Sequence, residues 1–504
     1  LNLASALESV DFRSPDSSLY QVLINLLTEG NFARPNIVAK SILSLLKHDP
    51  QLADLLTGHA IQRDLGDVAR TIEALQQLPL LHHLMRISPL PDLQVEGLFI
   101  AMRSLLLDNL DKIEETAQLT YFLSSLSLHC FTNEYVYFES VEESQRIDVL
   151  ELKIRTTLAQ AEQPRLLDLL SLAAYRPLHR YDWCKKLVVL DQLIKVKERL
   201  IEQPLAEMAA EKDIPGLRAI SNEVSLKVRT QYEENPYPRW MNLAMPITAI
   251  SVDKFFDEAG LILHSENIKT VAAPEILIAG CGTGQHSIGT AARFSDCQVL
   301  AVDLSLASLA YAQRKTRELS IHNLEYLQAD ILDLGQLDRE FDIIESAGVL
   351  HHMDNPIAGW KTLVGLLKPG GLMRIGLYSE LARSHIVEVR KEIASLAIGT
   401  SEADIRKFRQ SLAESCDENH QLLTTSRDFY SLSMLRDLIF HVQEHRFTLP
   451  QIKNCLDELG LKFCGFESKD ANSNFREFHG TEADIYDLTL WHHYEESKPQ
   501  TFAG

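Results

Sequence analysis

Apolar residues in the first 225 positions recur three and four apart, the spacing of one helix face. Leu19, Leu23 and Leu26 follow this pattern, and similar runs cover 65–78, 94–110, 115–130, 143–160 and 187–211. Short connectors carry proline, and glycine is scarce. We therefore predict an all-α accessory domain over 1–225. A helical-repeat-like array fits this pattern, although no fixed period is readable.

The pattern changes after residue 230. Short β-branched or apolar runs at 275–279, 298–302, 324–329, 341–346 and 372–378 alternate with helical stretches that begin near Gln285, Leu306 and Pro356. Strands that alternate with helices predict a parallel, Rossmann-like α/β sheet covered on both faces.

The remaining chain extends this sheet. Residues 380–447 are polar and helical, and we interpret them as a lid insertion after the fifth strand. A helix at 449–459 leads to two further expected strands at 461–466 and 484–491, separated by a polar loop. Paired antiparallel at the sheet edge, they would give seven strands. The expected order is accessory domain 1–225, linker and cofactor-closing segment 226–273, and α/β domain 274–504.

Composition narrows the function. The formal net charge is −21 and no Lys/Arg cluster stands out, which disfavours a nucleic-acid substrate. No apolar run is long enough to span a membrane, and the first residues lack the basic region of a signal peptide. The 7 cysteines are odd in number and widely spaced. This predicts reduced thiols, a cytoplasmic location and no metal site.

A glycine-rich loop follows the first expected strand. It runs Gly280-Cys281-Gly282-Thr283-Gly284 and opens a helix, so its backbone can approach a ligand closely. Asp303 ends the next strand, where an acid accepts ribose hydroxyls in dinucleotide folds. A nicotinamide or flavin site would need a further glycine, but Gln285 or Ser287 stands there. A tight turn without a ligand is the remaining alternative.

A set of motifs in the right order carries a family resemblance over about a hundred residues. They are the glycine loop, Asp303, Gln328-Ala329-Asp330-Ile331, Phe341-Asp342-Ile343-Ile344-Glu345-Ser346, Gly348-Val349-Leu350-His351-His352-Met353 and Leu367-Lys368-Pro369-Gly370-Gly371. The chain resembles class I S-adenosylmethionine-dependent methyltransferases. With its helical N-terminal region and the segment before the sheet, it is similar to bacterial fusions of helical-repeat regions to methyltransferase domains.

The resemblance implies S-adenosylmethionine as cofactor. Gly280, Cys281, Gly282, Thr283 and Gly284 would back its methionine part, Asp303 would hold the ribose, and Asp330, Ile331 and Leu304 would surround the adenine. Ser346 completes the expected cofactor set. The family usually has an acid two residues before the first glycine, which helps to orient the amino-acid end. Ile278 stands there, so another group is expected to supply that contact.

The segment Tyr232-Glu233-Glu234-Asn235-Pro236-Tyr237-Pro238-Arg239-Trp240 is the candidate for closing the site. Prolines stiffen it, and its aromatic and cationic side chains can grip a ligand. We expect Tyr232 to contact the cofactor and Tyr237 and Arg239 to contact the acceptor. A rigid linker between domains is the alternative.

Methyl transfer requires an aligned nucleophile, protection from water and, for some acceptors, a general base. His351, His352 and Glu345 are the candidate bases, because they lie near the carboxyl end of the expected sheet. Tyr378 would line the acceptor pocket. Packing and capping roles for the two histidines remain open.

The insertion contains His441-Val442-Gln443-Glu444-His445, which we expect to be helical, with both histidines on one face. The motif H-x-x-E-H also matches an inverted zinc-protease signature. That interpretation needs a distant third ligand, so we expect no metal and instead a lid whose histidines face the substrate.

The sequence thus predicts a methyltransferase for a small-molecule or polypeptide acceptor, the latter bound by the helical domain. The main alternative is a catalytically inactive scaffold that keeps the fold. Aminopropyl transfer is disfavoured, because no run of acids near the fourth strand could hold a polyamine. The oligomeric state is not readable.

Overall fold

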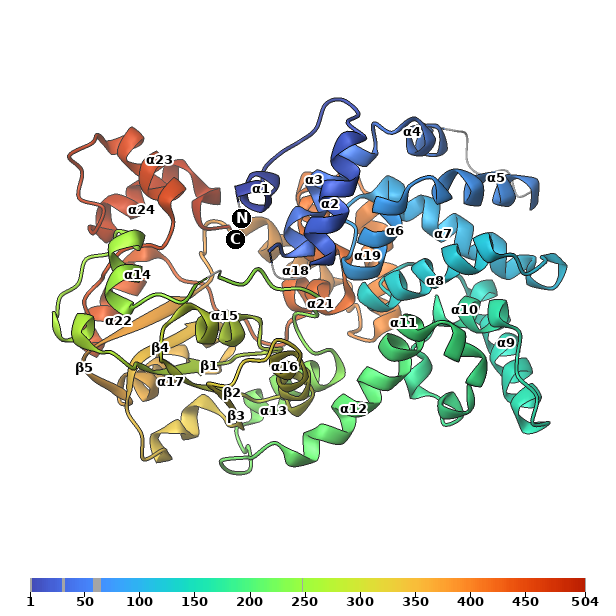
Figure 1. The fold of residues 1–504 in the computed structure, drawn as a ribbon. Helices are drawn as coiled ribbons and strands as arrows, with labels where there is room; N and C mark the ends of the chain where they lie inside the picture. The colour runs from blue at the N-terminus through green and yellow to red at the C-terminus, as the bar shows by residue number, and fades with distance from the viewer. Residues whose placement is uncertain (1, 30–31, 58–64, 247, 504) are drawn as a thin grey trace. The chain divides into compact units, whose positions relative to one another are not determined.

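The computed structural model describes residues 2–29, 32–57, 65–246 and 248–503 (Figure 1). The chain divides into two compact units. The first unit comprises Leu1–Ala209, Arg239–Ala244 and Ala394–Leu438, and the second comprises Ala210–Pro238, Met245–Ile393 and Ile439–Gly504.

The first unit is helical, as the sequence predicts. Its helices are α1 (Asn2–Leu7), α2 (Ser18–Thr28), α3 (Pro35–Leu46), α4 (Pro50–Thr57), α5 (Leu65–Gln76), α6 (Pro79–Ile87), α7 (Leu93–Asp108), α8 (Ala117–Thr132), α9 (Val141–Ala159), α10 (Leu166–Ala173), α11 (Ile194–Lys197) and α12 (Gln203–Ala210, whose last residue belongs to the second unit). Local signals set several starts. Ser140 and Glu143 form a capping box, and Pro79 begins α6. A regular repeat stays a prediction.

The central part of the insertion packs within this helical unit. It contains α19 (Glu402–Glu414), α20 (Glu418–Thr425) and most of α21 (Leu432–Phe440). The guanidinium of Arg409 donates to both carboxylate oxygens of Glu96, at 2.5 and 2.7 Å, and both side chains are buried. Arg406 donates to the carbonyl of Tyr135 at 2.6 Å. The insertion is therefore helical as expected, and Ala394–Leu438 is built into the first unit.

The second unit contains a parallel sheet with strand order β3-β2-β1-β4-β5. Its strands are β1 (Glu275–Ala279), β2 (Gln298–Asp303), β3 (Leu324–Gln328), β4 (Phe341–Ala347) and β5 (Leu367–Gly376). Helices α15 (Gln285–Arg293), α16 (Leu306–Glu318) and α17 (Pro356–Val364) begin where the sequence predicts. The expected Rossmann-like sheet is confirmed as five parallel strands.

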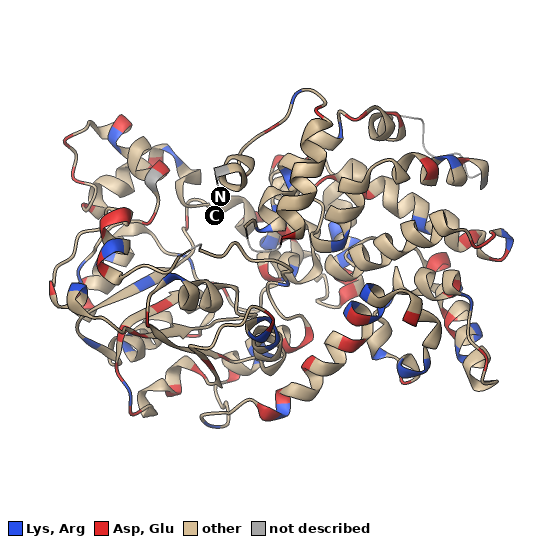
Figure 2. Cartoon of the chain, viewed as in Figure 1, with Lys and Arg blue, Asp and Glu red and all other residues tan. Residues whose placement is uncertain are grey.

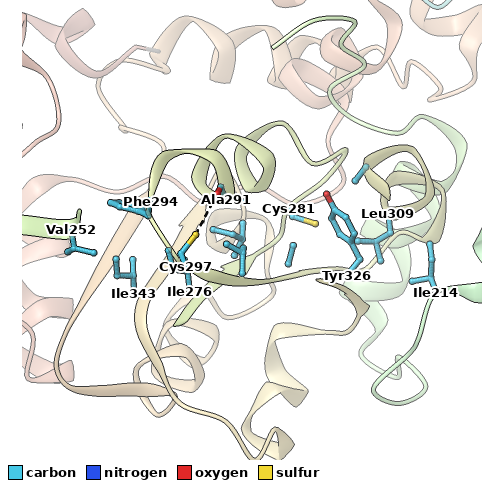
Figure 3. Close-up of a cluster of buried hydrophobic side chains, with 14 of the residues drawn as sticks. Ile214, Val252, Ile276, Cys281, Ala291, Phe294, Cys297, Leu309, Tyr326 and Ile343 are labelled. Carbon is cyan, nitrogen blue, oxygen red and sulfur yellow. Dashed lines mark hydrogen bonds between the residues drawn. The ribbon is translucent and has the colours of Figure 1, made fainter. Parts of the chain in front are cut away.

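Helices cover both faces of this sheet. Figure 3 shows one core cluster, in which Ile276 and Ile343 of the sheet pack with Ala291 of α15 and Leu309 of α16. The opposite cluster joins Leu277 and Ile344 to Trp360 of α17. Alternate residues of each strand therefore serve opposite cores, which explains their continuous apolar runs.

The two additional strands predicted near the C-terminus are wrong. Residues 461–466 form no strand, and 484–491 runs into α24 (Leu488–Ser497), which follows α22 (Leu449–Leu459) and α23 (Lys469–His479). Asp487 caps α24 by accepting from the Thr489 amide at 2.7 Å. Trp491 is fully buried and stacks on Phe475 of α23 at 4.2 Å between ring centroids. An aromatic core between helices thus replaces the expected sheet edge.

A short segment before α13 (Glu223–Glu234) extends the sheet at its other edge. Gly216 forms an isolated parallel bridge with Gln328 at the end of β3. The Leu217 amide donates to the Gln328 carbonyl at 2.9 Å, and the Gln328 amide donates to the Pro215 carbonyl at 2.8 Å. No local sequence pattern indicates this pairing.

Three further properties are the distribution of charge, the state of the cysteines and the length and polarity of the helices. Figure 2 shows Asp and Glu distributed over many helices with Lys and Arg between them, and none of the 7 cysteines forms a disulfide. Within the described ranges, every helix is too short or too polar to cross a bilayer.

Candidate active site

The glycine loop connects β1 to α15 with three residues in the left-handed region. The φ angles of Gly280, Gly282 and Gly284 are +80°, +52° and +84°. A Cβ on Gly280 would lie 2.3 Å from a methyl of Val349, and one on Gly282 would lie 2.6 Å from the Tyr237 carbonyl oxygen. Both the backbone conformation and close neighbours therefore require glycine.

Asp303 at the end of β2 lies directly beside this loop. Its carboxylate accepts from the amides of Gly282 at 2.8 Å and Ser305 at 2.9 Å. Burial raises the pKa of Asp303 in spite of these hydrogen bonds, and the nearby Glu233 adds to the rise. The two accepted bonds occupy about half of the lone-pair positions of a carboxylate, so this one can accept further hydroxyl donors.

Asp330 lies at the end of the neighbouring strand, β3. Its carboxylate accepts from the Leu332 amide at 3.0 Å, and Ile331 packs into the core. The Ala329 amide donates to the Asp303 carbonyl at 3.0 Å, and Gln328 donates to the Leu304 carbonyl at 2.9 Å. The acids expected to hold ribose and adenine thus lie at adjacent strand ends. Ser346 is buried, and its hydroxyl donates to the Ala279 carbonyl at 3.0 Å.

The predicted closing segment lies against the glycine loop. The Thr283 amide donates to the Tyr237 carbonyl at 3.4 Å, and the Thr283 hydroxyl donates to the Pro238 carbonyl. The Ser305 hydroxyl donates to the Tyr232 carbonyl at 3.1 Å. Residues 232–238 therefore contact both the loop and the residue that caps α16.

Glu233 belongs to the same segment, and the sequence did not predict its contact with α16. Its carboxylate accepts from the amides of Leu306 at 2.9 Å and Ala307 at 3.1 Å, where α16 begins. A carboxylate at a helix N-terminus is favourable because the exposed amides carry partial positive charge. No local pattern could reveal it, since about seventy residues separate the partners.

Two contacts of Arg239 lie within the first unit. It lies in the helical unit, with its Nε 3.9 Å from the Glu134 carboxylate and its guanidinium 5.2 Å from the centre of the Phe131 ring.

Glu345 of β4 faces α15. It is buried, accepts from the Thr290 hydroxyl at 2.9 Å and contacts His286 Nε2. Burial alone would raise the pKa of Glu345, but the hydrogen bond and charge of His286, aided by Arg374, lower it to about 2. A carboxylate with so low a pKa is a weak proton acceptor, which disfavours a general-base role.

Five of the predicted site residues form an aromatic cluster in the second unit. The rings of His351 and Tyr378 stack with centroids 3.7 Å apart, and those of His352 and His441 stack at 3.6 Å. The Tyr232 hydroxyl lies 3.2 Å from Nε2 of His441. We call these five residues the imidazole cluster.

Two histidines of the imidazole cluster, His351 and His441, have lowered pKa values and are therefore neutral near pH 7. Burial lowers the pKa of His441 to about 2, with help from His352 and Arg390. Burial likewise lowers the pKa of His351, and the charges of His352 and Arg383 add to the effect. A neutral imidazole presents one donor and one acceptor.

The expectation of a helix through 441–445 is wrong. Helix α21 ends at Phe440, and the following residues run beside the end of β5. The amides of His445 and Phe447 donate to the carbonyls of His351 at 2.7 Å and Tyr378 at 2.8 Å. These nonlocal hydrogen bonds hold the backbone extended, so His441 and His445 do not share a helix face.

Glu444 and His445, the remaining residues of the sequence that matches the inverted zinc-protease signature, have other partners. Glu444 is buried in an ion pair with Arg383 at 2.8 Å, and His445 Nε2 lies 2.9 Å from the Gln443 amide nitrogen. Burial would raise the pKa of Glu444, but the Arg383 guanidinium lowers it. The guanidinium of Arg383 also lies 3.6 Å from the centre of the Tyr378 ring, which places it beside the imidazole cluster.

Five parallel strands in the order β3-β2-β1-β4-β5, a glycine loop after β1 and acids after β2 and β3 define a class of protein. The C-terminal part of the chain is a class I S-adenosylmethionine-dependent methyltransferase domain, preceded by a large helical region. Residues 276–371 match the family described as "Methyltransferase domain". Its cofactor is S-adenosylmethionine.

Comparisons with individual proteins agree with this class. An uncharacterized protein of Synechococcus is 30% identical over 234 residues, covering 44% of this chain and 56% of the relative. The ubiquinone biosynthesis O-methyltransferase of Acinetobacter baumannii is 26% identical over 120 residues, covering 24% of this chain and 50% of the relative. The chain thus spans about half the length of these curated relatives.

Among solved structures, PKMT2 from Rickettsia typhi in complex with AdoHcy is similar, at 16% identity and a TM-score of 0.36. The match covers 55% of this chain and 51% of that one.

Proposed function

We propose that the protein transfers the methyl group of S-adenosylmethionine to an acceptor bound beside the imidazole cluster. One observation carries this proposal: Tyr232 joins the two halves of the candidate site. Its carbonyl accepts from Ser305, next to the candidate ribose acid Asp303, and its hydroxyl meets His441 of the cluster. Cofactor and acceptor residues predicted separately thus meet through one residue.

The chain's groups fit the cofactor. Asp303 retains acceptor capacity for the ribose hydroxyls, and Asp330 and Ile331 suit the adenine. The expected adenine contact Leu304 follows Asp303, and its carbonyl accepts from Gln328 at the end of β3. Gly284 caps α15 without a side chain, so the first amides of this helix can face the cofactor carboxylate. The cofactor supplies an activated methyl group on a sulfonium.

The imidazole cluster would position and shield the acceptor. Its three histidines are buried, which excludes competing water from the transfer. A neutral His351 can accept a hydrogen bond from an acceptor hydroxyl or amine and so orient its lone pair. The ends of the insertion near 380–393 and 439–447 supply part of this cover, consistent with a lid.

The burial of the imidazole cluster limits the size of the acceptor. A buried cluster suits a small molecule or one extended side chain better than a wide peptide groove. The relatives named as O-methyltransferases, including a malonyl-[acyl-carrier protein] O-methyltransferase of Marinomonas that is 33% identical over 119 residues, favour a small oxygen acceptor. A polypeptide bound by the helical unit is the second candidate.

Calorimetry with S-adenosylhomocysteine tests the cofactor site directly. Micromolar binding that is lost in Asp303→Ala is the expected result. Mass spectrometry of reactions with S-adenosylmethionine and either phenols and carboxylic acids or basic peptides then identifies the acceptor class. An absence of binding by the folded protein would overturn the proposal and leave an inactive scaffold.

A further inference from the structure

The acid missing from β1 has a counterpart on the neighbouring strand. In the parallel pairing of β1 with β4, Ile278 is the direct partner of Glu345. Paired residues of parallel strands lie on the same face of a sheet, about 5 Å apart. Glu345 therefore projects from the same face as Ile278, one strand away.

Glu345 holds helix α15 at two points. His286 lies in the first turn of this helix and Thr290 lies one turn later, and both contact the Glu345 carboxylate. Arg374 of β5 lies 3.0 Å from His286 and 3.9 Å from Glu345, so a second strand supports the same contact. The start of α15 is thus held to β4 and β5 by polar contacts around the buried Glu345 carboxylate.

The start of α15 is also the end of the glycine loop. Gly284 is the last loop residue and the N-cap of the helix, and its Cβ position is blocked by Ala312 at 2.6 Å. Only glycine therefore fits where the loop joins the helix. A shift of α15 would therefore redirect its first amides, which are the groups suited to bind a carboxylate.

We propose that Glu345 is a positioning residue for the amino-acid end of the cofactor and acts through His286, Thr290 and the first turn of α15. Glu345 on β4 thus replaces the acid that the family usually has on β1, where this chain has Ile278. The proposal rests on the proposed cofactor site, and it predicts a defect confined to ligands that carry the amino-acid end.

Two ligands separate this role from a general loss of structure. S-adenosylhomocysteine has the amino-acid end, whereas methylthioadenosine keeps adenine and ribose but lacks the carboxylate. Calorimetry on the full chain with Glu345→Gln should show binding of S-adenosylhomocysteine weakened roughly tenfold, because a charged hydrogen bond is lost. Binding of methylthioadenosine should change less than about twofold.

Asp342→Asn is the matched control. Asp342 is also a buried acid of β4, but it accepts from the Glu275 amide and pairs with Lys368, both at 2.9 Å, at the other end of the strand. This variant should lose stability without a selective loss of S-adenosylhomocysteine binding. Thr290→Val removes a single hydrogen bond and serves as a milder variant if Glu345→Gln folds poorly.

An exchange of the paired residues gives the sharpest test. The double variant Ile278→Glu, Glu345→Ile moves the acid across the pairing on the same face and should recover most of the lost affinity. Equal weakening of both ligands, unchanged S-adenosylhomocysteine binding in Glu345→Gln, or no recovery in the exchange would overturn the proposal. If the wild-type protein binds neither ligand, the proposed function fails instead.

Discussion

The hydroxyl of Tyr232 lies 3.2 Å from Nε2 of His441, although 209 positions separate the two residues in the chain. Tyr232 belongs to the segment that contacts the glycine loop, and His441 stacks on His352 after β4. This contact therefore connects the cofactor side of the candidate site to the acceptor side.

Removing this hydroxyl should affect turnover more than cofactor binding. Tyr232→Phe keeps the ring and loses one hydrogen bond, which is worth about 0.5–1.5 kcal/mol. We expect kcat/KM to fall roughly threefold to tenfold while S-adenosylhomocysteine affinity stays within about twofold. Tyr311→Phe on α16 is a control ring outside the cluster. A matching loss of cofactor affinity in Tyr232→Phe would contradict the assignment.

A side chain at Gly282 should displace the closing segment. In Gly282→Ala the new Cβ would lie 2.6 Å from the Tyr237 carbonyl oxygen, at a φ of +52° that disfavours alanine. We expect cofactor affinity to fall at least about tenfold, measured by calorimetry. The control is Gly289→Ala in α15, where a Cβ meets nothing within 4 Å. It should preserve binding and raise stability by about 0.5–1 kcal/mol.

The buried pair of Arg409 and Glu96 should dominate the stability of the helical unit. Arg409→Met leaves the Glu96 carboxylate buried without its cation, and such losses amount to about 3–5 kcal/mol. Urea unfolding followed by circular dichroism measures the change. Replacing both residues by methionine should recover much of it, and Arg155→Ala, which removes an exposed pair with Glu151, should stay within about 0.5 kcal/mol. Equal effects of Arg409→Met and Arg155→Ala would refute the prediction.

His129 should make the protein less stable in mild acid. It is buried between the Met85 carbonyl at 3.1 Å and the Tyr137 hydroxyl at 2.7 Å, and burial lowers its pKa from 6.5 to about 4. In the unfolded chain His129 is protonated below about pH 6.5, whereas in the folded chain it is protonated only below about pH 4. Stability is therefore full above pH 6.5 and falls toward pH 4, by up to about 3 kcal/mol from this residue.

His129→Gln should flatten this part of the pH profile. Urea midpoints at pH 7.5, 6, 5 and 4.5 would measure the difference between variant and wild type. His264→Gln, at an exposed histidine, is the control and should keep the wild-type slope. A slope unchanged by His129→Gln would show that other groups control the acid response.

Local patterns predicted most of the methyltransferase sheet. The apolar runs of the five strands and the starts of α15, α16 and α17 were readable because each is a continuous, correctly spaced signal. Residues 484–491 were wrongly predicted as a strand because apolar residues there alternate loosely with polar ones. These apolar residues are Ile485, Tyr486, Leu488 and Leu490. The Asp487 cap was the signal for a helix at that point.

The candidate site was only partly readable. Its glycine loop and acids are recognisable from short stretches of sequence. The extended backbone after His441 instead depends on hydrogen bonds from the amides of residues 445 and 447 to carbonyls distant in the chain. The role of Glu345 depends on its register against Ile278, which no single strand reveals. Neither the capping contact of Glu233 nor the placement of Arg239 in the helical unit follows from neighbours in sequence.

The pairing of Gly216 with Gln328 bears on how the protein can be divided. A fragment that begins at residue 226 or 274 would lose the segment that satisfies the Gln328 amide and carbonyl. The full length of β3 would then be an open edge, and open edges promote strand addition between copies. A shortened methyltransferase domain should therefore begin before Pro215 if the end of β3 is to stay covered.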